Sequence, residues 1–338
     1  MRTEYRSAVK ISIVYEAAPL PNRLNEDACA VRTDGESIAL FVADGAKQRL
    51  PTDQTKALFE QYGAGVNAAR FASQTARAVF YQSGDPFDPP AFLLRANQQI
   101  RDGLIQVYGE LSANALRQRE PQLAAYLDED PRLMRLALPA CVATAVHIDR
   151  GQNRLTYAHA GDTMLLLFHA DGGISIPTGD QMDNYDEEAL QLARQVQADH
   201  AADHLSDVLH DVRVDDRNRR NGLYHNYVDA AGTPDPAIGV GILNGLPELA
   251  AYMQQGHIEL NGVQGVLVCS DGFPWPAPLA ESADARAARY QAMRERIERD
   301  GMNGYFEALS RVKQADSSRD LYPRFKVQDD CTGIYVEL

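Results

Sequence analysis

The 338-residue sequence has little positive charge and no long apolar run. Its 33 Lys and Arg face 47 Asp and Glu, a net charge of −14, so no overall positive field attracts nucleic acid or an anionic membrane. No apolar stretch approaches bilayer-spanning length, and polar residues interrupt the N-terminal segment where a secretory signal needs a continuous apolar core. We therefore expect a cytoplasmic protein with no nucleic-acid partner and no membrane partner.

The sequence also lacks the common motifs of nucleophilic catalysis. It contains no GxSxG and no P-loop, and its cysteines, Cys29, Cys141, Cys269 and Cys331, form no CxxC pair. None of them is followed six residues later by the arginine that a cysteine phosphatase loop needs. Because each cysteine lies in or beside an apolar, strand-like segment, we expect buried free thiols.

Alternating apolar residues predict strands near both ends of the chain, with helical periodicity between them. The expected strands are 11–15, 28–32, 38–43, 141–148, 154–160, 164–170, 174–176, 265–270 and 333–338, and the expected helices are 52–81, 92–108, 186–211, 246–255 and 284–299. The connections within 141–176 are too short for crossovers, which favours antiparallel pairing. This order predicts an α+β fold in a single domain over 1–338, with an enlarged, irregular insert at about 182–262.

Four aspartates lie at the ends of apolar strand segments: Asp44, Asp162, Asp271 and Asp329. Carboxylates that meet at the edge of a buried sheet repel one another unless a cation lies among them. An all-oxygen ligand set suits Mg²⁺ or Mn²⁺, whereas zinc favours His or Cys. Asp-Gly is also a common turn pair, which explains any one of these residues more easily than all four together.

The acidic positions belong to an ordered series of short motifs. The series is Asn25-Glu26-Asp27-Ala28, Phe41-Val42-Ala43-Asp44-Gly45, Ala143-Thr144-Ala145, Ala160-Gly161-Asp162-Thr163, Thr178-Gly179-Asp180, Val268-Cys269-Ser270-Asp271-Gly272 and Asp329-Asp330-Cys331-Thr332. In order and spacing it resembles the PP2C (PPM) family of metal-dependent protein serine/threonine phosphatases, in its bacterial form, over nearly the whole chain. The resemblance implies a β-sandwich of two antiparallel sheets flanked by antiparallel helix pairs, in four layers α/β/β/α.

The resemblance also implies site roles and an activity, the hydrolysis of phosphoserine and phosphothreonine on proteins by a metal-activated water. Two Mn²⁺ or Mg²⁺ ions would share Asp44, with a third, more weakly held ion beside them. The implied metal ligands are Glu26, Asp44, Gly45 through its carbonyl, Asp162, Asp271 and Asp329, with Asp27 and Asp44 as the catalytic pair. A phosphoprotein substrate and a cognate Ser/Thr kinase would be the partners.

The sequence departs from the family pattern around the substrate phosphate. The family commonly places an arginine four residues before the motif glutamate, where this chain has Asn22, and Arg23 is one residue closer. A strand bulge would aim Arg23 into the site, whereas regular alternation would turn it away. Lys47 and Arg49, in an altered loop after Gly45, are alternative cations or simply solvated charges.

Other interpretations of the sequence are also consistent with parts of this pattern. A catalytically weak or inactive relative that binds a phosphoprotein or another partner would explain Asn22 and the altered loop, but it has no need for clustered carboxylates. A two-metal nuclease is opposed by the net charge of −14. His200 and His204 have a spacing that can bind zinc, although their polar neighbours favour a solvated helix face. The substrate, the physiological metal and the oligomeric state are not determined by the sequence.

Overall fold

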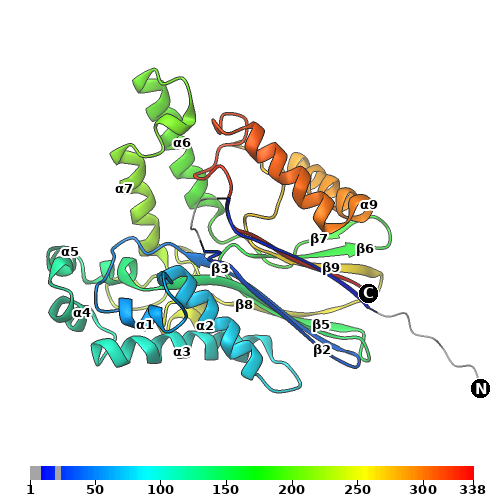
Figure 1. Ribbon diagram of the computed structural model, residues 1–338, viewed down its shortest axis with the longest axis horizontal. Helices are drawn as coiled ribbons and strands as arrows, with labels where there is room; N and C mark the ends of the chain where they lie inside the picture. The colour runs from blue at the N-terminus through cyan, green and yellow to red at the C-terminus, as the bar shows by residue number, and fades with distance from the viewer. Residues whose placement is uncertain (1–8, 20–23) are drawn as a thin grey trace, which may run out of the picture.

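The protein is described by a computed structural model that covers residues 9–19 and 24–338. The strands are β1 (Lys10–Glu16), β2 (Ala28–Asp34), β3 (Ser37–Ala46), β4 (Ala140–Asp149), β5 (Arg154–Ala160), β6 (Met164–His169), β7 (Ile174–Ser175), β8 (Gln254–Glu259), β9 (Val263–Cys269) and β10 (Cys331–Glu337). They form two five-stranded sheets, sheet A with the order β1-β10-β9-β6-β7 and sheet B with the order β2-β3-β4-β5-β8. All pairings within the sheets are antiparallel, and the two sheets lie face to face (Figure 1).

The two-residue periodicity of the strands separates an inner core from two outer cores. In β3, Leu40 and Val42 point between the sheets, whereas Phe41 points outward. In β9, Val268 points inward and Leu267 outward. Each central strand therefore buries both faces, which explains why these segments are nearly continuous apolar runs.

Helices cover the outer face of each sheet. They are α1 (Lys56–Glu60), α2 (Ala68–Gln82), α3 (Pro89–Tyr108), α4 (Ala113–Arg119), α5 (Ala124–Glu129), α6 (Asp183–His200), α7 (Val212–Asn221), α8 (Leu249–Tyr252) and α9 (Ala283–Ala315), with short 3₁₀ turns between some of them. On sheet B, Phe41 packs edge-on against Phe92 of α3, with ring centroids 5.1 Å apart. In the part of the chain that the structure describes, no helix is long and apolar enough to cross a bilayer.

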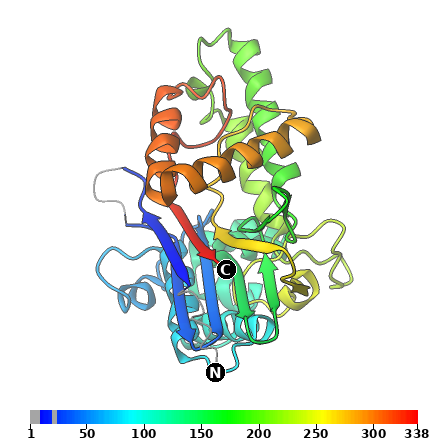
Figure 2. The same ribbon diagram turned by 90° about the vertical axis from the view of Figure 1, so that its right-hand side faces the viewer.

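On sheet A the cover is α9, which is kinked rather than straight. Gly301 has φ 72° and ψ 172°, a conformation that an L-residue rarely adopts, and it divides the helix into two parts. Figure 2 shows the two parts meeting at an angle above the sheet. Apolar side chains from both parts, including Ile297 and Tyr305, pack on Leu267 and Phe168.

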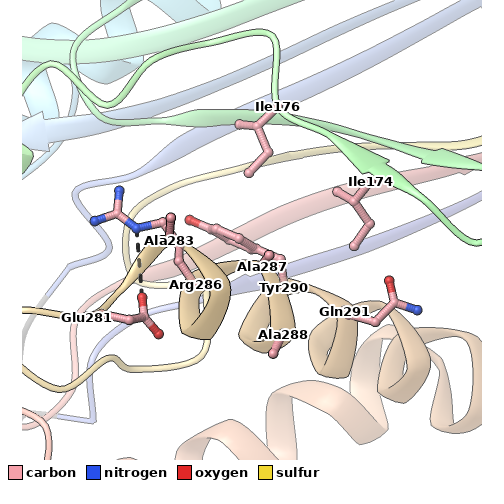
Figure 3. A pocket seen from close by; sticks show the side chains of 9 residues that line it. All are labelled: Ile174, Ile176, Glu281, Ala283, Arg286, Ala287, Ala288, Tyr290 and Gln291. Carbon is pink, nitrogen blue, oxygen red and sulfur yellow. Dashed lines mark ion pairs between the residues drawn. The ribbon is translucent and has the colours of Figure 1, made fainter.

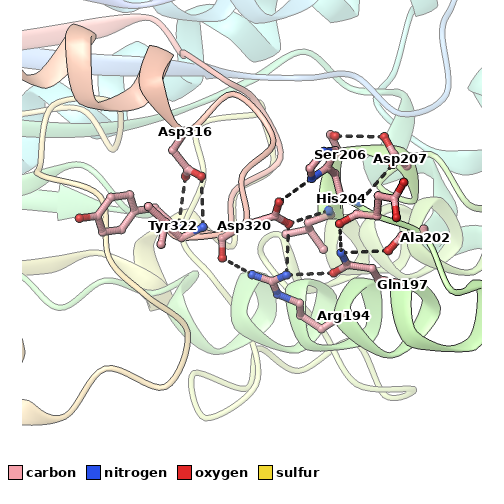
Figure 4. A network of polar contacts seen from close by, with 12 residues as sticks. Arg194, Gln197, Ala202, His204, Ser206, Asp207, Asp316, Asp320 and Tyr322 are labelled. Atoms are coloured by element: carbon pink, nitrogen blue, oxygen red, sulfur yellow. Dashed lines mark hydrogen bonds and ion pairs between the residues drawn. The ribbon is translucent and has the colours of Figure 1, made fainter.

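A helical arm, residues 183–224 with α6 and α7, projects from one end of the sandwich and packs beside the loop 316–330 that leads into β10 (Figure 1). Its small apolar core, which includes Leu190, Val208 and Val214, is covered by Phe325 from that loop. Polar contacts reinforce the junction (Figure 4). Asp320 accepts a hydrogen bond from the Leu205 amide at 2.9 Å and lies 2.8 Å from His204 Nδ1.

The same loop is tied to the end of α9. Arg324 binds Asp316 at 2.7 Å and donates to the carbonyl oxygen of Lys313, also at 2.7 Å. We call Arg194, His204, Asp316, Asp320 and Arg324 the clasp, because together they hold the loop 316–330 against the arm and α9. The arm and the C-terminal strand are thus fastened near the same end of the sandwich.

The expected fold, a sandwich of two antiparallel sheets covered by helices, is confirmed. Three local expectations were wrong. The predicted helix 52–81 is divided into α1 and α2 by the non-helical residues 61–67. The predicted helix 246–255 ends at Tyr252, and Gln254–Glu259 forms β8, which completes sheet B beside β5. The predicted helix 186–211 is α6 alone up to His200, because Ala201 adopts a left-handed conformation (φ 50°) that ends it. The cysteines are free thiols, three buried and Cys29 partly buried.

Candidate metal centre

The acidic residues of the sequence motifs meet at one end of the sandwich. Antiparallel pairing places the start of β2 beside the end of β3, since Ala28 lies opposite Ala43. It likewise places Met164, at the start of β6, opposite Cys269, at the end of β9. The neighbouring carboxylates, which we call the cleft carboxylates, are Asp27, Asp44, Asp162, Asp271 and Asp329. Residues more than 300 positions apart in the chain thus come to lie around one cleft.

Asp27 is fully buried, with 0% of its surface exposed. Its Oδ2 accepts a hydrogen bond from Ser270 Oγ at 2.8 Å, whereas its buried Oδ1 has no hydrogen-bond partner among the described residues. Burial raises the pKa of Asp27 to about 8, and the charges of Asp330 and Asp271 act in the same direction. A buried carboxylate with one unpaired oxygen is costly, so this side chain is prepared for a cation or a hydrogen-bond donor.

Asp44 lies near the end of β3, at the centre of the cleft carboxylates. Burial raises its pKa well above the ordinary value, and the charges of the other four cleft carboxylates raise it further. Its carboxyl group is close enough to that of Asp271 for the two to share a hydrogen bond. Carboxylates this close repel one another, and a cation among them would offset that repulsion.

Gly45 and Glu26 lie where helix α2 meets β3. A Cβ atom at position 45 would lie 2.8 Å from backbone atoms of Ala69 and from the carbonyl oxygen of Glu26, so only glycine fits. The Glu26 carboxylate accepts a hydrogen bond from Asn67 Nδ2 at 2.6 Å, and its carbonyl oxygen accepts one from Ser73 Oγ at 2.6 Å. Both partners belong to the first turns of α2, which fixes the segment that carries Glu26 and Asp27.

Asp162 and Asp271 line the cleft from sheet A and the β5–β6 loop. Burial raises the pKa of Asp162 well above its ordinary value, and the charges of Asp271, Asp180 and Asp186 add to this effect. The buried Asp162 Oδ1 has no hydrogen-bond partner among the described residues. Asp271 is exposed to the cleft, and its pKa is raised by its enclosure and by the charge of Asp329.

Asp330, the residue next to Asp329, has a structural role that the sequence does not reveal. Its buried carboxylate accepts hydrogen bonds from the backbone amides of Ala18 at 2.8 Å and Glu26 at 2.7 Å. Asp330 thus anchors the backbone on both sides of the segment 20–23 and thereby positions Glu26.

These residues fit divalent cations in their chemistry. They offer carboxylate oxygens, the ligands that Mg²⁺ and Mn²⁺ prefer, and two of those oxygens, on Asp27 and Asp162, are buried and unpaired. Among residues 9–19 and 24–338, no three Asp, Glu, His or Cys side chains already stand close enough to one another to hold an ion between them. The donor set is therefore present, while the side chains must still close around an ion.

Three basic residues bear on how the cleft would hold a phosphate group. The first, Arg23, lies outside the described residues, as does Asn22. Arg49 interacts electrostatically with Asp186 and Asp215 of the arm, which places it toward the arm. Lys326, which sequence reasoning does not single out, lies 2.7 Å from Oδ1 and 2.6 Å from Oδ2 of Asp329. Its position three residues before a motif aspartate is the only signal for it in the sequence.

The histidine pair at 200 and 204 binds no common partner in the described part of the chain. His204 belongs to the clasp, whereas His200 lies near Arg213 and Asp211, with 3.9 Å between His200 Nε2 and Asp211 Oδ2. These separate partners do not support a zinc site at the two histidines.

The only tryptophan, Trp275, lines the cleft and also packs under Arg296, whose guanidinium carbon lies 4.5 Å from the ring centroid.

The cleft continues into an apolar cavity between β7 and the first part of α9. A cavity of about 480 Å³ is lined by Asp162 and Asp271 at one end and by Ile176 and Tyr290 at the other. Ile176 and Tyr290 also line a second cavity of about 770 Å³, where Ile174 faces the helix (Figure 3). A groove therefore runs from the acidic cluster to an apolar pocket large enough for side chains of a bound polypeptide.

Comparison with known proteins agrees with the motif series. A model of the family described as Protein phosphatase 2C matches residues 21–309. No relative among curated proteins matches the chain in sequence.

Several solved structures share a similar fold with this chain. RsbX in complex with magnesium is 12% identical, with a TM-score of 0.48 over 100% of this chain and 98% of that one. The serine/threonine phosphatase Stp1 from Staphylococcus aureus gives the same identity, TM-score and coverage: 12%, 0.48, 100% and 98%. The catalytic domain of the serine threonine protein phosphatase PstP in complex with two manganese ions is 16% identical, with a TM-score of 0.44 over 97% of each chain. At these TM-scores the likenesses add no argument about the chemistry of this chain.

Proposed function

Because the chain belongs to the protein phosphatase 2C family, we propose that it hydrolyses phosphoserine and phosphothreonine on proteins with the help of divalent metal ions held by the cleft carboxylates. The observation that carries the proposal is the pair of buried, unpaired carboxylate oxygens on Asp27 and Asp162, within a cluster whose pKa values are raised by burial and mutual repulsion. A cation is the partner that such a cluster lacks.

The proposed ligand assignment is the one that the family resemblance implies. Asp44, with Glu26 and the carbonyl of Gly45, would hold one ion, and Asp44, Asp271 and Asp329 would hold the other. Asp162 and Asp271 would hold a third ion. When bound, such ions supply positive charge that makes water a nucleophile near neutral pH and that neutralises charge on the phosphoryl oxygens. Mn²⁺ and Mg²⁺ both suit these oxygen ligands.

Groups of the protein itself would orient the attacking water and the substrate. Asp27 is held by Ser270, so its free Oδ1 keeps a fixed direction and would accept a hydrogen bond from the attacking water. The groove from the cleft to Ile176 would take the polypeptide on one side of the phosphorylated residue. A phosphoprotein substrate is therefore favoured over a free small phosphate ester, and a Ser/Thr kinase would generate that substrate.

The test uses the full chain after removal of metal with a chelator. Mn²⁺ should restore hydrolysis of both p-nitrophenyl phosphate and a phosphothreonine peptide, and Asp44→Ala should abolish both activities. Lys10→Met, which removes only a surface ion pair with Glu337, should leave both unchanged. Undiminished activity of Asp44→Ala would refute the metal-site assignment.

A catalytically weak regulatory protein is the second candidate. It is favoured by Asn22, which stands where the family commonly has its arginine, and by the altered loop after Gly45, whose Arg49 interacts with the arm. Binding of Mn²⁺ without turnover of either substrate would support this candidate over the phosphatase.

A further inference from the structure

Lys326 brings a positive charge into the part of the cleft that the proposed function gives to the second metal ion. Its ammonium group contacts both carboxylate oxygens of Asp329, at 2.7 and 2.6 Å. Asp44 and Asp271 also act on it electrostatically. These three aspartates are the proposed ligands of that second ion.

Lys326 places its ammonium group among carboxylates, as a bound cation would be placed. Its ammonium group, paired with Asp329 and facing the charges of Asp44 and Asp271, offsets part of the mutual repulsion among the aspartates. Lys313, the other lysine that interacts with Asp271 and Asp329, instead donates to the carbonyl oxygen of Gly272 at 2.6 Å and is buried.

We propose that Lys326 is an internal cation that occupies the second-metal position and competes with the divalent ion for Asp329. The proposal rests on the proposed function for the identity of the metal ligands. A divalent ion bound to Asp329 would lie within a few ångströms of the ammonium, and the two positive charges would repel each other. Binding of the second ion therefore requires Lys326 to withdraw.

The local structure allows this exchange. The Lys326 side chain is 46% exposed, so a long, flexible stem can carry the ammonium out into solvent. The backbone around it is anchored, because Arg324 Nε donates to the carbonyl oxygen of Val327 at 3.1 Å and Gln328 Nε2 to that of Ser310 at 3.2 Å. Asp329 would keep its place while the lysine leaves, since its Oδ1 also accepts the Asp330 amide at 2.9 Å.

The competition has a functional consequence for the metal centre. The second ion would bind only at a higher concentration of free divalent ion than it would in a chain without Lys326, because it must replace the ammonium. The occupancy of the complete site would thus depend on the divalent ion level, with a threshold set by Lys326.

The experiment measures Mn²⁺ binding directly, by calorimetric titration of the chelator-treated full chain. Lys326→Met should bind the second Mn²⁺ about tenfold more tightly than the wild type, whereas Lys326→Arg, which keeps the charge, should resemble the wild type. Lys10→Met is the matched control, because it removes a lysine paired with a carboxylate outside the cleft at 2.7 Å. It should leave both binding steps unchanged.

Thermal melting provides a second readout that does not depend on activity. Without metal, Lys326→Met should melt below the wild type, because the aspartates lose their compensating charge, and saturating Mn²⁺ should reverse that order. If Lys326→Met folds poorly, Lys326→Gln serves in both measurements.

Two outcomes would overturn the proposal: an unchanged second Mn²⁺ affinity in Lys326→Met, and a weaker one. An unchanged affinity accompanied by weaker inhibition by inorganic phosphate would show that Lys326 is instead a phosphate ligand. Failure of the proposed function is a separate result, since a wild type that binds Mn²⁺ without turnover still permits the comparison of affinities.

Discussion

The cleft and the clasp lie at the same end of the molecule, and both contain aspartates. The fold favours the ionised form of the aspartates in the clasp and disfavours it in the cleft. In the clasp, Asp316 accepts hydrogen bonds from two backbone amides and from Arg324, which hold its pKa below the ordinary value although burial opposes this. Asp320, bound by the Leu205 amide and His204, has a pKa lowered to about 2 against the effect of burial. In the cleft, the pKa values of Asp27 and Asp44 are raised.

This difference separates structural carboxylates from functional ones. The fold supplies the clasp with donors from its own chain, so ionised Asp316 and Asp320 stabilise the folded state. In the cleft, Asp27, Asp44 and Asp162 receive too few donors, and because their pKa values are raised, their ionisation destabilises the folded state unless a cation is bound. Charge alone does not distinguish the two sets in the sequence, since all are aspartates near loops or strand ends.

The largest expected effect is that of Asp271→Asn. Activity with Mn²⁺ should fall by at least about 100-fold, because even residues that only support metal ligands contribute up to that amount. The metal-free variant should nevertheless melt at a higher temperature than the wild type at pH 8, because the pKa of Asp271 is raised in the folded state and ionisation is therefore unfavourable there. Phosphatase assays and calorimetric melts measure the two effects.

Asp320→Asn is the counterpart from the clasp. Its pKa is lowered in the folded state, so removal of the charge should lower the melting temperature while leaving Mn²⁺-dependent activity within a few-fold of the wild type. If both variants shifted the melting temperature in the same direction, the distinction between the two sets would fail.

The next effect concerns the stability of the clasp. Arg324→Ala would leave the Asp316 carboxylate, which is 5% exposed, without its ion pair. We expect a loss of about 3 kcal/mol in the free energy of unfolding, the usual cost of breaking a buried pair from one side. Urea unfolding measures it, with Arg299→Ala as control. Arg299 pairs with Asp300 on the surface, where solvent screens the pair and almost no loss is expected.

The sequence predicts the cleft better than the clasp for a physical reason. The cleft residues are attached to strands whose two-residue periodicity is strong, so the residue pattern alone places Asp44 and Asp271 at strand ends. The clasp joins irregular segments more than 100 positions apart, such as His204 and Asp320. No periodicity connects such segments, and their pairing depends on the path of the arm.

Other differences between the sequence expectations and the fold have equally specific causes. Strand β8 resembles part of a helix in the sequence because Gln254–Glu259 is an edge strand with an exposed face and few apolar residues. The role of Asp330 depends on backbone amides near residues 18 and 26, which no side-chain pattern reveals. Lys326 does not stand out because a lysine near an aspartate is ordinarily a surface pair.

A smaller effect would test whether the groove extends the cleft toward a polypeptide. Ile176→Glu places a charge where the two cavities join, which should raise the KM for a phosphothreonine peptide about tenfold by removing apolar contact. Turnover of p-nitrophenyl phosphate should not change, because that molecule does not reach the groove. Val212→Glu, at a side chain 77% exposed on α7, is the control and should alter neither. An equal change for both substrates would show that Ile176 acts on the acidic cluster instead.

The smallest effect is the pH dependence of the clasp. Asp320 raises the pKa of His204 by hydrogen bonding, and the charges of Asp207 and Asp203 raise this pKa further. The contribution of His204 to stability is therefore complete below its ordinary pKa of 6.5, and it disappears as pH rises through the higher pKa of the folded state. The Asp320 contribution is complete above its ordinary pKa of 3.8 and is lost only as pH falls toward about 2. The ion pair should therefore stabilise the arm most between these two ordinary values. His204→Gln should lower the melting temperature by a small amount at pH 5.5, and the difference from the wild type should vanish by pH 8.5. A difference that stayed constant over this range would mean that His204 stabilises the junction by packing and neutral hydrogen bonding rather than by its charge.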